Sequence, residues 1–362
     1  MINYRKFSLF IFMIGFLLVL PKSYTNILDK QGHPRQEVVD IFRQFKGLLE
    51  ENKSLLLINN EQSAASLRYV LTEDDFNKIL DFQVSAADIS LDSLNVIAQK
   101  IFLRPANLER KDIVEDDNKF SSYVTNDLWK LFAAIGDIGS IYPTQQKYMY
   151  MIINGSTVQN MRQRIQALIN LMNESKVQIF PSTQLVFLSG ERDLFPEETK
   201  AVLLNSAPLL QNPDWKGPAT LPVTEDQAAE FIWDQALLPD ALRKAQISFV
   251  KAKKTEYIDA KTGVKTFKRP TTADTVLKWI ADFKPEPGAC LAISSQPFVH
   301  YQEATTYGIF KKLGLLNKGF TVEAVGFDTV EKSGPFESLS KRAAVYMDNL
   351  ARTIFTELSN KK

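Results

Sequence analysis

Five short apolar runs, each followed by a polar or glycine-containing turn and then a helix-like stretch, occupy the second half of this 362-residue chain. Apolar runs of strand length that alternate with helical patterns are typical of strand–helix–strand units, which form parallel sheets covered by helices on both faces. We therefore predict an α/β fold with a doubly wound, mostly parallel five-stranded sheet of Rossmann-like type. The predicted strands are Tyr148–Ile153, Leu185–Leu188, Ile247–Val250, Cys290–Ile293 and Thr321–Val325.

The segment before the sheet has a different pattern. Between residues 35 and 135 apolar residues recur at helical spacing, and runs of β-branched residues are scarce. This predicts an N-terminal helical extension over residues 30–145, packed against a Rossmann-like domain over residues 146–362. Helices are expected at Gln36–Glu51, Ser63–Leu71, Glu73–Phe82 and Ser90–Phe102, with a closing helix at Leu339–Leu358.

The first 25 residues have the pattern of an export signal. Two basic residues precede an apolar run from Phe7 to Leu20, and small residues follow at Ser23 and Thr25, where a cleavage site would lie. The run is shorter than the roughly 20 residues that span a bilayer. We expect residues 1–25 to be either a cleaved signal or an uncleaved anchor that holds the protein to the inner membrane through residues 7–20. Both alternatives predict an exported protein, in the periplasm or on the periplasmic face of the inner membrane.

The charge balance argues against a nucleic-acid-binding protein. Lys and Arg number 43 and Asp and Glu number 42, which gives a net charge of +1. Nucleic acids are held by clustered cationic side chains. The densest basic segment, residues 251–269, also contains Glu256 and Asp259, so we interpret it as a solvated, hairpin-like insertion after the third strand.

Metal and thiol chemistry have few candidate residues. The single cysteine, Cys290, lies in a predicted core strand, where a thiol usually acts as a small hydrophobe. The two histidines, His33 and His300, form no His/Cys cluster with the spacing of metal ligands. We therefore expect no metal site.

Small and polar residues follow several of the predicted strands. Open parallel sheets bind ligands in the crevice beyond the carboxyl ends of the strands, so these residues should meet at one edge. A glycine there lets the chain turn sharply into a helix, whose N-terminus favours an anionic ligand group. Each turn is ordinary taken singly, and their convergence is what predicts a small-molecule pocket. The candidate ligand-binding residues are Asn154, Gly155, Ser156, Ser189, Gly190, Arg192, Thr224, Thr272, Ser294 and Ser295.

Three acidic or basic side chains near this edge are candidate catalytic residues. Glu225 and Asp274 each lie in the first turn of a predicted helix, where a carboxylate either stabilises the helix dipole or serves as a hydrogen-bond acceptor or general base. His300 begins another helix and could titrate near neutral pH, or could simply cap that helix. The sequence from Thr224 to Gln227 fits a capping box with Thr224 as the cap.

Arg192 has two interpretations of its own. Its guanidinium could bind a carboxylate or a phosphate through two nitrogens, or it could pair with its neighbours Glu191 and Asp193.

The sequence lacks the fingerprints of several enzyme classes. No Gly-x-Gly-x-x-Gly follows the first strand, as a nicotinamide or flavin site would require. A Walker-type Gly-Lys-Ser/Thr loop and a Gly-x-Ser-x-Gly nucleophile elbow are also missing.

These polar segments, in this order, resemble the envelope-associated family whose members include SanA, ElyC and YdcF (domain of unknown function 218). The family pattern runs from a strand ending in Gly, through a helix with Arg and Ala-Leu, to a strand ending in Ser-Gly-Gly. A Thr/Ser-Glu-Ala helix start, a Thr-x-Glu-Asn motif and a strand ending in Thr-Ser before a His follow. The segments that resemble them, within residues 147 to about 326, are Ile152–Gly155, Arg164 with Ala167-Leu168, Leu188–Gly190, Thr224-Glu225, Thr272–Thr275, Ser294-Ser295 and His300.

The resemblance implies a role in envelope biogenesis or barrier function. One family member looks able to bind S-adenosylmethionine, so the resemblance implies that molecule as a candidate cofactor. Two positions depart from the family pattern, with Glu191 in place of a glycine and Glu303 where an arginine is usual. Both changes make the predicted ligand edge more acidic.

The leading hypothesis is an envelope-associated protein that binds a small, anionic molecule at the carboxyl edge of the sheet. One alternative is a hydrolase or transferase, binding S-adenosylmethionine or a nucleotide, with Glu225 or Asp274 as the base. Another is a non-catalytic interaction protein whose N-terminal helices bind a partner.

Overall fold

The computed structural model describes residues 26–362 apart from 58–68, 105–119, 121, 259–262 and 329–334. The predicted export signal therefore lies outside the described residues, as does most of the helix expected at Ser63–Leu71. Within the described part, no helix combines the length and the apolar character needed to cross a membrane.

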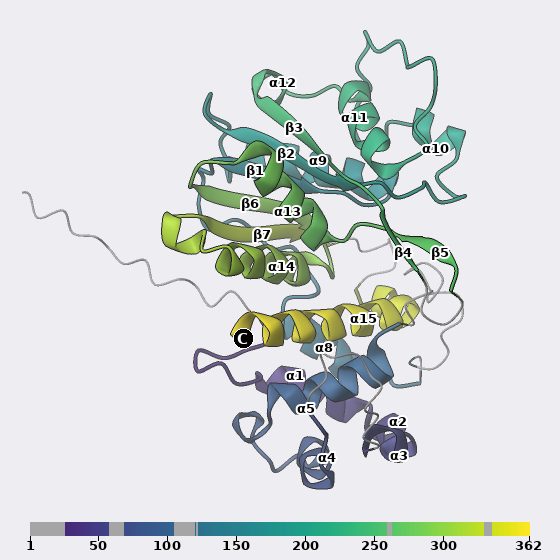
Figure 1. Cartoon of the computed structure of the whole chain (residues 1–362), viewed down its shortest axis with the longest axis vertical. Helices are drawn as coiled ribbons and strands as arrows, with labels where there is room; N and C mark the ends of the chain where they lie inside the picture. Colours follow the sequence, from purple (N-terminus) through teal and green to yellow (C-terminus); the bar gives the residue numbers. More distant parts are fainter. Residues whose placement is uncertain (1–25, 58–68, 105–119, 121, 259–262, 329–334) are drawn as a thin grey trace, which may run out of the picture.

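The sheet is parallel and five-stranded, as predicted from the apolar runs (Figure 1). Its strand order is β3-β2-β1-β6-β7. The chain adds β2 and β3 on one side of β1, and it then adds β6 and β7 on the other side. This reversal makes the fold doubly wound, and it opens a crevice between the carboxyl ends of β1 and β6. The strands are β1 (Tyr150–Asn154), β2 (Gln184–Gly190), β3 (Gln246–Ala252), β6 (Ala289–Ser295) and β7 (Thr321–Phe327).

Several polar residues that the sequence places in turns are the last residues of strands. The β2–β3 ladder continues through Ser189 and Gly190, and the β6–β7 ladder continues through Ser294 and Ser295. Backbone pairing does not depend on side-chain polarity, so the ladders run past the apolar stretches that were used to predict the strands.

Helices cover both faces of the sheet. Apolar side chains of α9 (Val158–Asn173) and α11 (Glu225–Gln235) pack on one face, and those of α13 (Thr272–Phe283) and α14 (Val299–Lys312) pack on the other. The strand residues alternate between the two cores, as the pleat requires. Short elements complete this part of the chain: α10 (Lys200–Leu204), α12 (Asp240–Lys244) and η3 (Leu316–Lys318).

The charged insertion after β3 forms a hairpin, as the sequence predicts. Its antiparallel strands are β4 (Thr255–Ile258) and β5 (Lys265–Lys268). The chain after β5 returns to the body of the protein and enters α13.

The N-terminal region is helical, and it packs against the last helix of the chain. Apolar side chains of α15 (Pro335–Lys361), such as Leu339, Met347 and Ile354, share one core with the N-terminal helices. In Figure 1, α15 lies between α14 and these helices. The elements before the sheet are α1 (Gln36–Gln44), α2 (Lys46–Glu51), α3 (Lys53–Leu57), α4 (Glu73–Leu80), η1 (Ala86–Asp88), α5 (Leu91–Ile97), η2 (Ala98–Phe102) and α8 (Asn126–Ala134).

The structure corrects two predicted helix boundaries in this region. The single helix expected at Gln36–Glu51 is two helices, because the chain leaves helical geometry at Phe45. The helix expected over Ser90–Phe102 begins as predicted, with the Ser90 side chain accepting a hydrogen bond from Ser93 N, but its second half is π-helical.

Candidate functional site

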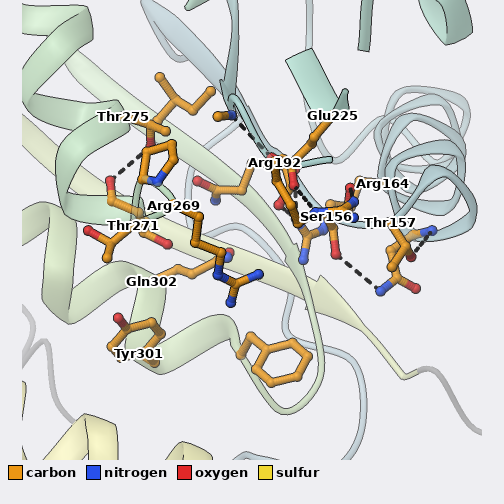
Figure 2. Close-up of a pocket in the computed structure, with 18 of the residues that line it drawn as sticks. Ser156, Thr157, Arg164, Arg192, Glu225, Arg269, Thr271, Thr275, Tyr301 and Gln302 are labelled. Carbon is orange, nitrogen blue, oxygen red and sulfur yellow. Dashed lines mark hydrogen bonds and ion pairs between the residues drawn. The ribbon is translucent and has the colours of Figure 1, made fainter. Parts of the chain in front are cut away.

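A cleft of about 330 Å³ lies at the carboxyl ends of β1 and β2. Its floor is the β1–α9 loop, and its walls come from the start of α13, from α14 and from α15 (Figure 2). We call it the arginine cleft, because six arginines line it and Glu225 is its one acidic lining residue in the part of the chain that the structure describes. The six are Arg104, Arg164, Arg192, Arg269, Arg342 and Arg352.

Gly155 begins the floor of the cleft. A Cβ atom at this position would lie 2.8 Å from the carbonyl oxygen of Leu188 and would collide with the Glu225 carboxylate. Only glycine allows this close approach of the β1–α9 loop to β2. Thr157 then caps α9, its side chain accepting a hydrogen bond from Asn160 N.

The N-terminus of α9 already binds an anionic group of the protein itself, the side chain of Glu198. Val158 N donates to Glu198 Oε1 at 2.7 Å, and Glu198 is 8% exposed. The sequence predicts that this helix start favours an anionic ligand group. The Glu198 side chain occupies that position instead, and nothing in the local sequence pattern indicates so distant a partner.

Arg192 is held by two carboxylates, the buried Glu198 and the largely buried Glu225. Its guanidinium lies 2.8 Å from Glu198 and 2.9 Å from Glu225. It also donates to the carbonyl oxygen of Ser156 at 3.2 Å. Neither of the carboxylates proposed from the sequence as its surface partners, Glu191 and Asp193, forms an ion pair with it; Asp193 accepts from it only through the backbone carbonyl. Arg192 therefore fixes the floor of the cleft more than it extends toward a ligand.

Glu225 is the second carboxylate that binds Arg192, and both of its oxygens accept hydrogen bonds. One carboxylate oxygen accepts from Gly190 N at 3.2 Å and the other from Arg192 Nε at 2.9 Å. Burial raises the pKa of Glu225, and the positive charge of Arg192 opposes that rise. Since both oxygens are engaged, the main role visible in the geometry is to hold Arg192 at the end of β2, with the carboxylate packed against Gly155.

Arg164 holds the same loop from the direction of β6. It donates to the carbonyl oxygens of Asn154 and Gly155 at 2.6 and 2.9 Å, and to Ser295 Oγ at 3.3 Å. Arg164 and Ser295 thus bridge the two strands on either side of the crevice where the strand order reverses.

The opposite wall carries the other four arginines. Arg269 follows the β4–β5 hairpin, and Figure 2 shows its side chain extending from the start of α13 into the middle of the group. Arg104 and Arg352 lie close together because both contact Asp348, a fully buried carboxylate of α15. None of these wall arginines is predicted from the sequence, because they come from segments that are distant along the chain.

Two buried amide side chains of the cleft have unsatisfied atoms. Asn154, at the end of β1, is 3% exposed, and Gln302, in α14, is 7% exposed. Asn154 Nδ2 and Gln302 Oε1 are buried without a hydrogen-bond partner. Such groups are rare in folded proteins and often mark functional positions.

The structure brings together six of the ten ligand-binding residues proposed from the sequence. Asn154, Gly155, Ser156, Gly190, Arg192 and Thr272 line the cleft together with Glu225. Ser189, Ser294 and Ser295 are buried beneath it; the Ser189 hydroxyl donates to the carbonyl oxygen of Val250.

Thr224 does not form the predicted capping box. Its hydroxyl donates to Asp226, and no backbone amide of α11 donates to its side chain. The Gln227 side chain instead accepts from Val223 N. The carboxylate two residues along competes for the hydroxyl that a capping box would need.

Asp274 and His300 lie outside the residues that line the cleft. Asp274 closes a capping box at α13, accepting from both the amide and the hydroxyl of Thr271. His300 is packed against Gly136, and burial lowers the pKa of His300 to about 4, so the ring is neutral at pH 7.

We compared this chain with protein-family models, with curated proteins and with solved structures, and no significant match is found. The assignment of function therefore rests on the chemistry of the cleft.

Proposed function

We propose that this protein binds an anionic small molecule in the arginine cleft, as an envelope-associated protein of the kind that includes SanA, ElyC and YdcF. The observation that carries the proposal is the convergence of six arginines on one cleft in which Glu225 is the one acidic lining residue of the described chain. Guanidinium groups suit phosphate and carboxylate because their donors match those oxygens in geometry and charge.

The position of the cleft supports the same proposal. It lies beyond the carboxyl ends of β1 and β2, next to the point where the strand order reverses, which is the usual ligand site of a doubly wound sheet. Its floor is preorganised by Arg164 and Arg192, so ligand binding would not have to order it.

Thermal unfolding with inorganic phosphate or pyrophosphate tests this proposal. Both anions should raise the midpoint of unfolding in a concentration-dependent way, because a ligand that binds only the folded state stabilises it. Arg269→Gln should weaken phosphate binding about 10- to 100-fold, the range for loss of one charged hydrogen-bonding partner. Lys244→Gln, at an exposed site on α12, is the matched control. Equal stabilisation of the Arg269 variant and of wild type would contradict the proposal.

A second candidate is a hydrolase or transferase with Glu225 as the general base. It is favoured by a single observation, the raised pKa of a largely buried carboxylate that lines the cleft. If the protein hydrolyses phosphate esters, Glu225→Gln should abolish that activity. S-adenosylmethionine belongs among the ligands screened. Asp274→Asn should cost stability and leave turnover unchanged, because Asp274 caps α13.

The envelope location depends on residues 1–25, whose pattern indicates export. Fractionation of cells that produce the full chain should place it with the periplasm or the inner membrane. Mass determination of the purified protein then distinguishes a cleaved signal from an anchor.

A further inference from the structure

The two unsatisfied amides of the arginine cleft restrict the chemistry of its ligand beyond charge. Asn154 Nδ2 is a donor that lacks an acceptor, and Gln302 Oε1 is an acceptor that lacks a donor. Both residues are more than nine-tenths buried, so bulk water does not satisfy these atoms freely.

The two amides belong to the two halves of the sheet. Asn154 ends β1, and Gln302 lies on α14, the helix that follows β6. Because β1 and β6 are neighbours at the point where the strand order reverses, these side chains flank the crevice in which doubly wound sheets bind ligands.

A fully ionised phosphate group cannot satisfy both atoms. Its oxygens accept hydrogen bonds, which suits Asn154 and the arginines, but without a P–OH hydrogen the group has nothing to donate to Gln302. A hydroxyl group both donates and accepts. A ligand that binds with a fully ionised phosphate therefore satisfies both atoms only if it also carries a hydroxyl or an N–H group.

The size of the cleft narrows the choice further. A volume of about 330 Å³ lies near the lower end of the roughly 300–1,000 Å³ that ligand pockets usually have. Such a space suits one sugar ring with its phosphate better than a dinucleotide.

From these observations we propose that the ligand is a sugar phosphate, with its phosphate bound by the wall arginines and its hydroxyls bound by Asn154 and Gln302. This inference rests on the proposed function, because it assumes that the arginine cleft is the binding site. It adds the class of ligand and assigns the two residues that distinguish a sugar phosphate from a simple phosphate.

Calorimetric titration of the full chain with matched probes tests the assignment. The probes are inorganic phosphate, methyl phosphate, glucose 1-phosphate, glucose 6-phosphate and glucose. At least one hexose phosphate should bind about tenfold more tightly than methyl phosphate, the gain expected from one or two additional hydrogen bonds. Glucose should bind far more weakly than methyl phosphate or either hexose phosphate, because it has no anionic group for the arginines to bind.

Gln302→Met provides the test at the level of the residue. The variant should bind methyl phosphate as wild type does, and the preference for the hexose phosphate should fall to within about threefold. Without ligand it should be as stable as wild type or more so, because an unsatisfied buried oxygen has been replaced by an apolar group of similar shape. A glutamine with a purely structural role would give a less stable protein instead. Asn154→Leu repeats the test from the other side of the crevice.

The outcomes separate the two proposals. If none of the phosphates binds, the proposed function fails, and this inference fails with it. If phosphate and methyl phosphate bind but neither hexose phosphate binds more tightly, the arginine cleft remains an anion site and the sugar-phosphate assignment is overturned. An unchanged preference in both Gln302→Met and Asn154→Leu also overturns the assignment.

Discussion

At the scale of single residues, the floor of the arginine cleft depends on one buried cation shared by two carboxylates. Arg192 and Glu198 are buried, the Glu225 side chain is 13% exposed, and each of the three makes several hydrogen bonds. A buried ion pair contributes little net stability compared with an apolar group, but the loss of one partner leaves an uncompensated charge in the interior. The cluster therefore fixes the geometry of the β1–α9 loop, and we expect substitutions of its members to be strongly destabilising.

Arg192→Met should lower the free energy of unfolding by about 3–5 kcal/mol at pH 7, because Glu198 and Glu225 would lose their shared counter-charge. Urea unfolding measures the effect. Lys130→Met, which removes an exposed partner of Asp127, should change stability by less than about 1 kcal/mol. Similar losses of unfolding free energy in the two variants would contradict the prediction, because the buried ion pairs would then matter no more than an exposed one.

Gly155→Ala should be destabilising by about 1–3 kcal/mol, because the new methyl group meets the backbone of Leu188 and the Glu225 carboxylate. It should also weaken phosphate binding by displacing the loop. Gly47→Ala, where the added Cβ reaches only ordinary contact distance from Tyr123, is the control and should be neutral or slightly stabilising. Thermal unfolding with and without phosphate reports both effects.

Glu357 should make stability depend on pH. Burial raises its pKa from 4.5 to about 7, so the folded state binds a proton more tightly than the unfolded chain does. The resulting stabilisation is complete below about pH 4.5 and is lost as the pH rises through 7. Glu357→Gln should match wild type at about pH 4 and exceed its stability by up to about 3 kcal/mol at about pH 8.

Denaturant unfolding across this pH range measures the dependence on Glu357. Glu51→Gln, at an exposed position, should follow wild type throughout. A Glu357→Gln variant that parallels wild type at every pH would contradict the prediction.

At the scale of elements, the helices that border the cleft begin in different ways. In α13 the Thr271 side chain accepts from Asp274 N while Asp274 accepts from Thr271 N, which completes a capping box. In α11 the predicted box at Thr224 is absent, because Asp226 binds the hydroxyl. Both starts carry Thr followed by acidic residues, so local sequence alone does not separate them.

Thr271→Ala should cost about 1 kcal/mol of stability, the usual effect of losing a side-chain N-cap. Thr224→Ala should cost less, because no backbone amide of α11 depends on that hydroxyl. Thermal unfolding of the two variants in parallel makes the comparison, and an equal or larger loss for Thr224→Ala would contradict it.

At the scale of the whole molecule, the cleft joins parts that are distant along the chain. Its floor comes from β1 and the segment after β2, while its far wall comes from Arg104 and from α15. Helix α15 also shares its core with the N-terminal helices, so the last helix connects the sheet to the extension. The site is therefore complete only when all three parts are assembled.

Asp348→Asn tests this assembly. Asp348 is fully buried and contacts Arg104 and Arg352, so the variant should lose about 3–5 kcal/mol of stability and also bind phosphate more weakly. Asp127→Asn, an exposed partner of Lys130, should change stability by less than about 1 kcal/mol. Chemical unfolding and phosphate titration measure both effects in the two variants. Equal losses in Asp348→Asn and Asp127→Asn would show only a general effect of removing a carboxylate.

The sequence by itself determined the sheet, its parallel sense and the edge at which Asn154, Gly155, Gly190 and Glu225 meet. It could do so because apolar periodicity and turn residues are local properties of the chain. Only the tertiary structure decided that Glu198 fills the start of α9, that α15 packs with the N-terminal helices and that distant arginines form the far wall. Those contacts join residues that no local pattern pairs, because they arise from how whole elements bury their apolar faces against one another.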